Sequence, residues 1–99
     1  MSRGPDAGTR LARALESAGP AVVVTARRST PWASVTFTGA RHALTVEAPA
    51  SVTLDAWLEA LPEAEFAIPG HLVADLAVVE VRRDGARVRA VIEVLTVEA

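Results

Sequence analysis

The sequence predicts an α+β fold, a two-layer sandwich in which an antiparallel sheet carries two helices on one face. Two segments have the apolar spacing of amphipathic helices, and each is followed by β-like segments separated by turn residues. The order of these elements is the same in both halves of the chain. Because each helix has one apolar stripe to bury, a sheet with both helices on one face is the simplest solution. A circularly permuted ferredoxin-like arrangement, in which two short β segments are not true strands, is the alternative.

The first helix is expected in "TRLARALESAG", where Leu11, Leu15 and Ala18 share one face, Thr9 caps the start and Gly19-Pro20 ends the helix. The second is expected in "TLDAWLEALP". Its stripe of Leu54, Trp57, Leu58 and Leu61 should be among the most buried parts of the chain, with Thr53 as its cap and Pro62 after its last turn.

Three strands are predicted after each helix. In the first half they are "AVVVTARR", "WASVTFT" and "ALTVEA", separated by "STP" and "GARH"; Val35, Phe37, Leu44 and Val46 should share the buried face. In the second half they are "AEFAI", "HLVADLAVVEV" and a strand from Val88 to the end. The pentapeptide "LTVEA" occurs at 44–48 and again at 95–99, and "GAR" also recurs. A duplication with halves 9–48 and 52–99 explains this order, and chance in an Ala- and Val-rich chain is the competing explanation.

The register of the last hairpin follows if Asp84-Gly85 is a two-residue turn. Counting outward places Glu80 opposite Arg89 and His71 opposite Glu98. One face then carries Leu95 and Val97, which should point at the helices if the duplication is real. Glu93 also falls on that face, which is awkward for a buried surface. The opposite, outer face is apolar as well and is the predicted interface: Val73, Ala77, Val79, Val81, Val88, Ala90, Ile92 and Val94.

Composition limits the chemistry. The 99-residue chain suits one domain over 1–99, with a flexible N-terminus over 1–8. It has no Cys and no Lys, which removes thiolate, Schiff-base and P-loop lysine chemistry. A net charge of −2 argues against nucleic acid as a partner. We find no signal peptide and no apolar run of membrane-spanning length, so we expect a cytoplasmic protein without a membrane partner.

Few residues suggest a catalytic or binding site. His71, Asp75 and Glu98 are predicted on neighbouring strands and form a candidate acid-base group, because a carboxylate can orient a histidine and set its pKa. Arg82, Arg83, Arg87 and Arg89 form a candidate anion site, although such arginines more often protect a hairpin from edge pairing. His42 is expected in a turn without a partner. The two histidines lack the spacing of metal ligands, so no metal and no cofactor are expected.

We therefore expect a non-enzymatic interaction domain that forms a homo-oligomer, most simply a dimer, through its outer sheet face. A protein partner is a further expectation. A small-ligand binder for an anionic metabolite, or a minor acid-base enzyme around His71, Asp75 and Glu98, is the alternative function. A sheet that curls far enough to cover its own outer face is the alternative structure.

Overall fold

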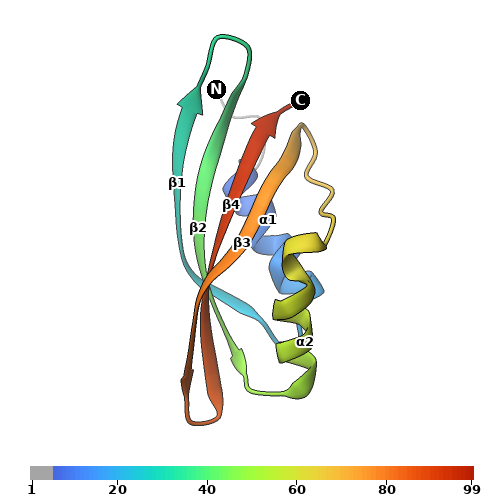
Figure 1. Cartoon of the computed structure of the whole chain (residues 1–99), viewed down its shortest axis with the longest axis vertical. Helices are drawn as coiled ribbons and strands as arrows, with labels where there is room; N and C mark the ends of the chain where they lie inside the picture. Colours follow the sequence, from blue (N-terminus) through green and yellow to red (C-terminus); the bar gives the residue numbers. More distant parts are fainter. Residues whose placement is uncertain (1–5) are drawn as a thin grey trace.

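The structure, a computed structural model that describes residues 6–99, confirms the α+β fold (Figure 1). Two helices and four antiparallel strands alternate along the chain as helix, hairpin, helix, hairpin. Their bounds are α1 Ala7–Ala18, β1 Val23–Ala33, β2 Thr38–Pro49, α2 Val52–Ala60, the 3₁₀ turn η1 Leu61–Glu63, β3 His71–Asp84 and β4 Arg87–Glu98. The strand order is β1-β2-β4-β3, so the two hairpins meet at β2 and β4. Neither helix of the 6–99 region is long and apolar enough to cross a membrane.

Both helices begin earlier than predicted. Asp6 caps α1 by accepting a hydrogen bond from the backbone N–H of Thr9 at 2.8 Å, and the N–H of Gly19 closes the helix on the carbonyl of Leu15. Ala7 and Gly8, predicted to be flexible, are therefore helical, and residues 1–5 of that prediction lie outside the described residues. Ser51 caps α2 through the N–H of Leu54 at 2.9 Å.

Each half contains two long strands instead of three short ones. The "STP" segment, predicted to interrupt the strand, lies within β1, where Pro31 is tolerated because β1 is an edge strand. The hairpin turn falls at 34–37, so "GARH" belongs to β2, and Val35 and Phe37 are exposed at the hairpin tip instead of buried. The predicted strand at 64–68 makes only an isolated bridge, from Ile68 to His71.

The turn between β3 and β4 is displaced by one residue from the prediction. Asp84 pairs with Arg87, and the two turn residues are Gly85, at φ +62°, and Ala86. A glycine with positive φ at the first turn position is the signature of a type II′ hairpin. Glu80 consequently lies opposite Val91 instead of Arg89. Further along, register shifts at Val73/Asp75 and Val78/Glu80 restore the alignment, so His71 does pair with Glu98.

The two faces of β4 are exchanged relative to the prediction, which placed Leu95 and Val97 on the helix side by equating the two copies of "LTVEA". The displaced turn is not the cause, because moving it by one residue moves each partner by two and leaves the faces unchanged. Leu44 pairs with Ile92, and both are fully buried beneath the helices. Glu93, which the predicted register placed on the buried side, is exposed on the opposite face. The predicted interface is corrected accordingly: Val88, Ala90, Ile92 and Val94 belong to the core, Val73 packs against it, and Val81 shares their side by pairing with Ala90. From alternation along β3, Ala77 and Val79 remain on the outer face.

The same register bears on the internal duplication, which is not confirmed. Leu44 is buried and Thr45 faces outward, whereas Leu95 faces outward and Thr96 is buried. The two copies of "LTVEA" are an odd number of residues apart, and an odd offset exchanges the faces of strands that pair without a bulge. The repeated pentapeptides are therefore not structurally equivalent, although the order of elements does repeat.

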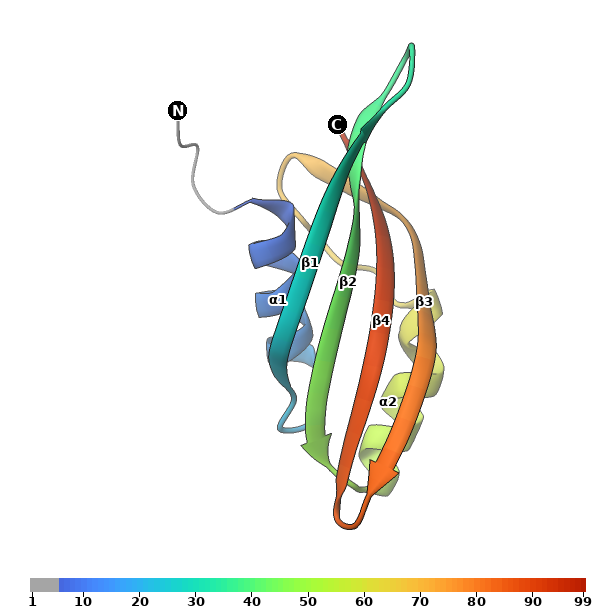
Figure 2. The ribbon, with the colours of Figure 1, turned by 90° about the vertical axis from the view of Figure 1, so that its left-hand side faces the viewer.

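The core lies between one face of the sheet and both helices. Leu11 and Leu15 of α1 and Leu54 and Leu58 of α2 belong to one apolar cluster with Ile92. Trp57 lies at the rim of this cluster and is partly exposed. Figure 2, viewed past the β1 edge, shows the strong twist of the sheet and α1 to one side of it. The edge strands β1 and β3 do not pair with each other, so the sheet stays open and does not close over its outer face.

Candidate functional site

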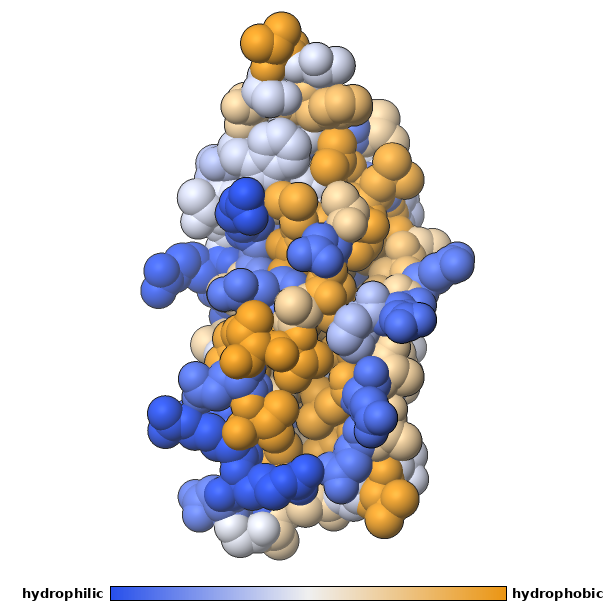
Figure 3. Space-filling view, in the orientation of Figure 1, coloured by the Kyte–Doolittle hydropathy of each residue, from blue (hydrophilic) through white to orange (hydrophobic). Residues whose placement is uncertain are grey.

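The outer face of the sheet, called the open face below, is not covered by any element of the 6–99 region. Figure 3 shows this face with an apolar strip running down its middle between charged groups. The cross-strand pairs between neighbouring strands, followed from β1 to β3, identify the residues whose side chains lie on this face. The apolar residues of the open face are Val23, Ala26, Trp32, Ala43, Val91, Leu95, Val97, Leu72, Ala77 and Val79. Leu72 and Val79 are 63% and 50% exposed, and such a patch is unusual on a free monomer.

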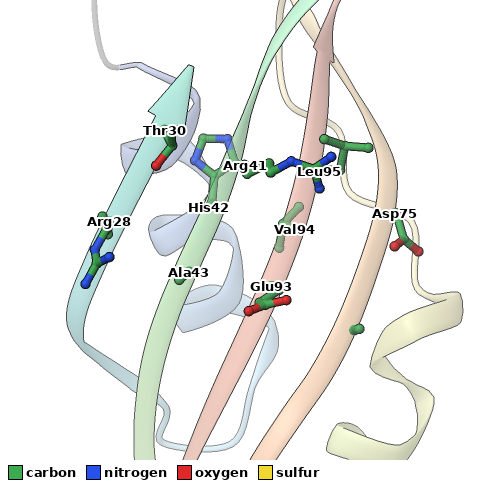
Figure 4. A pocket seen from close by; sticks show the side chains of 10 residues that line it. Arg28, Thr30, Arg41, His42, Ala43, Asp75, Glu93, Val94 and Leu95 are labelled. Carbon is green, nitrogen blue, oxygen red and sulfur yellow. The ribbon is translucent and has the colours of Figure 1, made fainter. Parts of the chain in front are cut away.

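Four charged side chains surround a shallow hollow of about 250 Å³ in the middle of the open face (Figure 4). Arg28 comes from β1, Arg41 from β2, Glu93 from β4 and Asp75 from β3. None of them makes an ion pair or a hydrogen bond within residues 6–99. The positive charges therefore lie on the β1-β2 half of the face and the negative charges on the β4-β3 half. In Figure 4 the Arg41 side chain extends across β4 toward Leu95.

The arginines of the last hairpin, predicted as an anion site, each have a carboxylate partner. Arg83 pairs with Asp55 of α2 at 2.6 Å and Arg82 with Glu80 at 2.7 Å. Arg89 and Arg87 both approach Glu47, at 3.3 and 4.0 Å. An anion would have to compete with these carboxylates, so the hairpin is a weaker candidate than the open-face hollow.

The predicted acid-base group of His71, Asp75 and Glu98 is divided between two faces. His71 and Glu98 pair at the end of the sheet and line a cavity on the helix side. Asp75 lies beyond the bulge at Ala74, opposite Leu95, and lines the open-face hollow. The Nδ1 atom of His71 is 3.2 Å from the carbonyl oxygen of Pro69. The register shift thus separates the carboxylate of Asp75 from the imidazole it was predicted to assist.

His42 has the partners that the sequence did not reveal. Its ring is 3% exposed, with Nδ1 2.7 Å from Ser29 Oγ and Nε2 2.9 Å from Thr96 Oγ1. Burial lowers the pKa of His42, because the imidazolium ion loses its hydration, and the nearby Asp6 carboxylate opposes this shift. The ring is therefore neutral at neutral pH. The even spacing of His42 from Leu44 and Val46 was the available sign that it lies on the core face.

No group of three or more acidic, histidine or cysteine side chains in the 6–99 region is arranged to hold a metal ion. No family model, no curated protein and no solved structure matches the chain. The open face and the side chains around His42 are therefore the two features of the fold that bear on function.

Proposed function

We propose that the protein is a self-associating interaction domain whose open face binds the open face of a second copy. The observation that carries this proposal is the arrangement of the four unpaired charges, with Arg28 and Arg41 on the β1-β2 half of the face and Glu93 and Asp75 on the β4-β3 half. The other charged side chains of the face, Glu47, Glu80, Arg82 and Arg89, are already ion-paired within the chain. A face with opposite charges on its two halves is complementary to itself after a half-turn.

The pairing follows from the strand order. A two-fold axis parallel to the strands, lying between two stacked sheets, places β2 over the partner's β4 and β1 over the partner's β3. Arg41 then lies over the partner's Leu95, two residues along the strand from the partner's Glu93. Arg28 lies over the partner's Ala77, two residues from the partner's Asp75. Sheets stack about 10 Å apart, a gap that long side chains can bridge.

The size of the face suits a specific dimer. Strands of 12 residues, four abreast, present a surface of roughly 19 by 40 Å at about 4.8 Å between strands and about 3.3 Å per residue. That area of about 750 Å² is close to the ~800 Å² that each partner buries in an ordinary specific interface. The apolar strip would be desolvated at the centre, as in other interfaces.

The oligomeric state tests the proposal. Light scattering is expected to give twice the 10.4 kDa mass of the chain for the wild type. Arg41→Glu places two acidic side chains against each other and is expected to give a folded monomer, because like charges brought together at an interface cost several kcal/mol. Arg13→Glu, a charge reversal on the exposed surface of α1, is the matched control and should remain a dimer. A wild type that stays monomeric at high concentration would overturn the proposal.

A further inference from the structure

We infer that Ser29, His42 and Thr96 form a second site, on the helix side of the sheet, where Ser29 accepts the acyl group of a small ester. The three side chains come from β1, β2 and β4 and form one hydrogen-bonded chain, with 2.7 Å between Ser29 and His42 and 2.9 Å between His42 and Thr96. A hydroxyl group hydrogen-bonded to an imidazole that is itself oriented by a third side chain is the general arrangement of an activated serine.

The hydrogen bonds of Thr96 determine which nitrogen of His42 carries the proton. Its hydroxyl donates to the carbonyl oxygen of Ala40 at 3.4 Å, so its oxygen is free to accept from His42 Nε2–H. With the ring proton on Nε2, the Nδ1 lone pair faces Ser29 and accepts the Ser29 hydroxyl proton. His42 is thus a neutral base in contact with the nucleophile, and Thr96 is a positioning residue.

The site is open to a small substrate. Ser29 is exposed, and with His42 and Thr96 it lines a cavity of about 230 Å³ at the start of α1. The first turn of α1 lies against the nucleophile, since a Cβ atom on Gly8 would be 2.8 Å from Ser29 Oγ. Within α1, Asp6 accepts the N–H groups of Thr9 and Arg10, so the N–H groups of Ala7 and Gly8 have no acceptor in the helix. Because Ala7 and Gly8 also line the cavity, we assign their N–H groups as the donors for a developing oxyanion.

Ser29 and His42 supply the nucleophile and the proton acceptor for both steps of ester hydrolysis. Ser29 Oγ attacks the ester carbonyl carbon while its proton moves to His42 Nδ1. The tetrahedral intermediate then collapses, the ester C–O bond breaks, and the leaving alcohol takes the proton from Nδ1. Water then attacks the acyl carbonyl carbon while its proton moves to the same nitrogen. The bond between the acyl carbon and Ser29 Oγ breaks, Nδ1 returns the proton to Ser29 Oγ, and the acid is released. The transient imidazolium is favoured by the Asp6 carboxylate and opposed by the Arg27 guanidinium. His71 and Glu98 are the other titratable groups that line the cavity.

Two assays test the inference. The first measures hydrolysis of p-nitrophenyl acetate, and the second labels the protein with a fluorophosphonate and locates the labelled residue by peptide mass spectrometry. We expect the label on Ser29, and a rate that falls about 100-fold or more in Ser29→Ala, because the variant has no nucleophile. Because Ser29 is exposed, Ser29→Ala is expected to fold, and circular dichroism checks this. Ser17→Ala, on the exposed side of α1, is the matched serine control and should keep the wild-type rate.

Two further readouts distinguish catalysis from a structural role. The rate should fall as pH decreases through the pKa of His42, which lies below its ordinary 6.5. Thr96→Val should lower the rate and move this limb of the pH profile, and Thr96→Ser should restore both. Absence of label on Ser29, or an unchanged rate in folded Ser29→Ala, would overturn the inference. Neither result depends on the oligomeric state, because Ser29 lies on the helix side of the sheet.

Discussion

The two faces of β2 and β4 differ far more than their sequences do. On the helix side, Leu44 and Ile92 are completely buried within a continuous apolar cluster. On the open side, Val91 and Leu95 are equally apolar, yet they are only partly covered and stand beside the unpaired Arg41 and Glu93. Apolar content therefore does not distinguish a core face from an interaction face in these strands. The positions of the charges do.

The largest expected effect is a difference between neighbouring residues of β4. Ile92→Ala should lower the free energy of unfolding by about 3 to 4 kcal/mol, because it removes a fully buried side chain and leaves a cavity. Val91→Ala, one residue away on the open face, should cost less than about 1 kcal/mol, since its side chain is not enclosed. Urea unfolding of both variants in the Arg41→Glu background isolates the contribution of the single chain. Equal losses would show that the two faces are not distinct.

The sequence was sufficient to predict the α+β class, both helices and the turn region near Gly85. It was not sufficient to assign the faces of the last hairpin. Both faces are apolar, so hydrophobic alternation could not decide which of them lies under the helices. The decisive sign was Glu93, which fits an exposed face and not a buried one. The two β-bulges in β3 have no signature in the sequence, and the one at Ala74 explains why Asp75 lies on the opposite face from His71.

The side chains around His42 were equally hidden from sequence analysis. His42 and Thr96 are 54 residues apart, and Ser29 reaches His42 only because β1 pairs with β2 through the segment predicted as a break. Local patterns describe neighbours within one strand, whereas this group joins three strands. The sequence analysis predicted His42 in a turn, so it could not predict that His42 lies on the core face beside Ser29 and Thr96.

A substitution at Trp57 tests how much a partly buried side chain at the rim of the core contributes to the free energy of unfolding. A fully buried tryptophan costs about 3 to 5 kcal/mol when truncated to alanine, but Trp57 is partly exposed, so Trp57→Ala should cost about 2 kcal/mol. Leu58→Ala in the same helix, which empties a buried position, is the internal reference. Chemical unfolding that gives Trp57→Ala the larger loss would place the ring in the centre of the core.

His42 makes the core face sensitive to pH. Its pKa is lowered in the folded protein by burial, so the unfolded chain binds the proton more readily. The free energy of unfolding should consequently be highest above pH 6.5 and decrease as pH falls from 6.5 toward the folded-state pKa. His42→Gln should flatten this dependence. Unfolding measured in buffers above and below pH 6.5 checks the sign, and a wild type that gains stability on acidification in this range would contradict it.

The open face as a self-complementary surface is tested most directly by mixing two charge-reversed variants. Arg41→Glu and Glu93→Arg should each be monomeric alone, because each homodimer would bring like charges together across the two-fold axis. In an equimolar mixture every Arg41–Glu93 contact is again between opposite charges, so a heterodimer of twice the 10.4 kDa chain mass should form. Only contacts between chains can be restored by mixing. Light scattering that shows a dimer in the mixture and monomers in the separate solutions is the predicted result, and a mixture that remains monomeric would contradict the account.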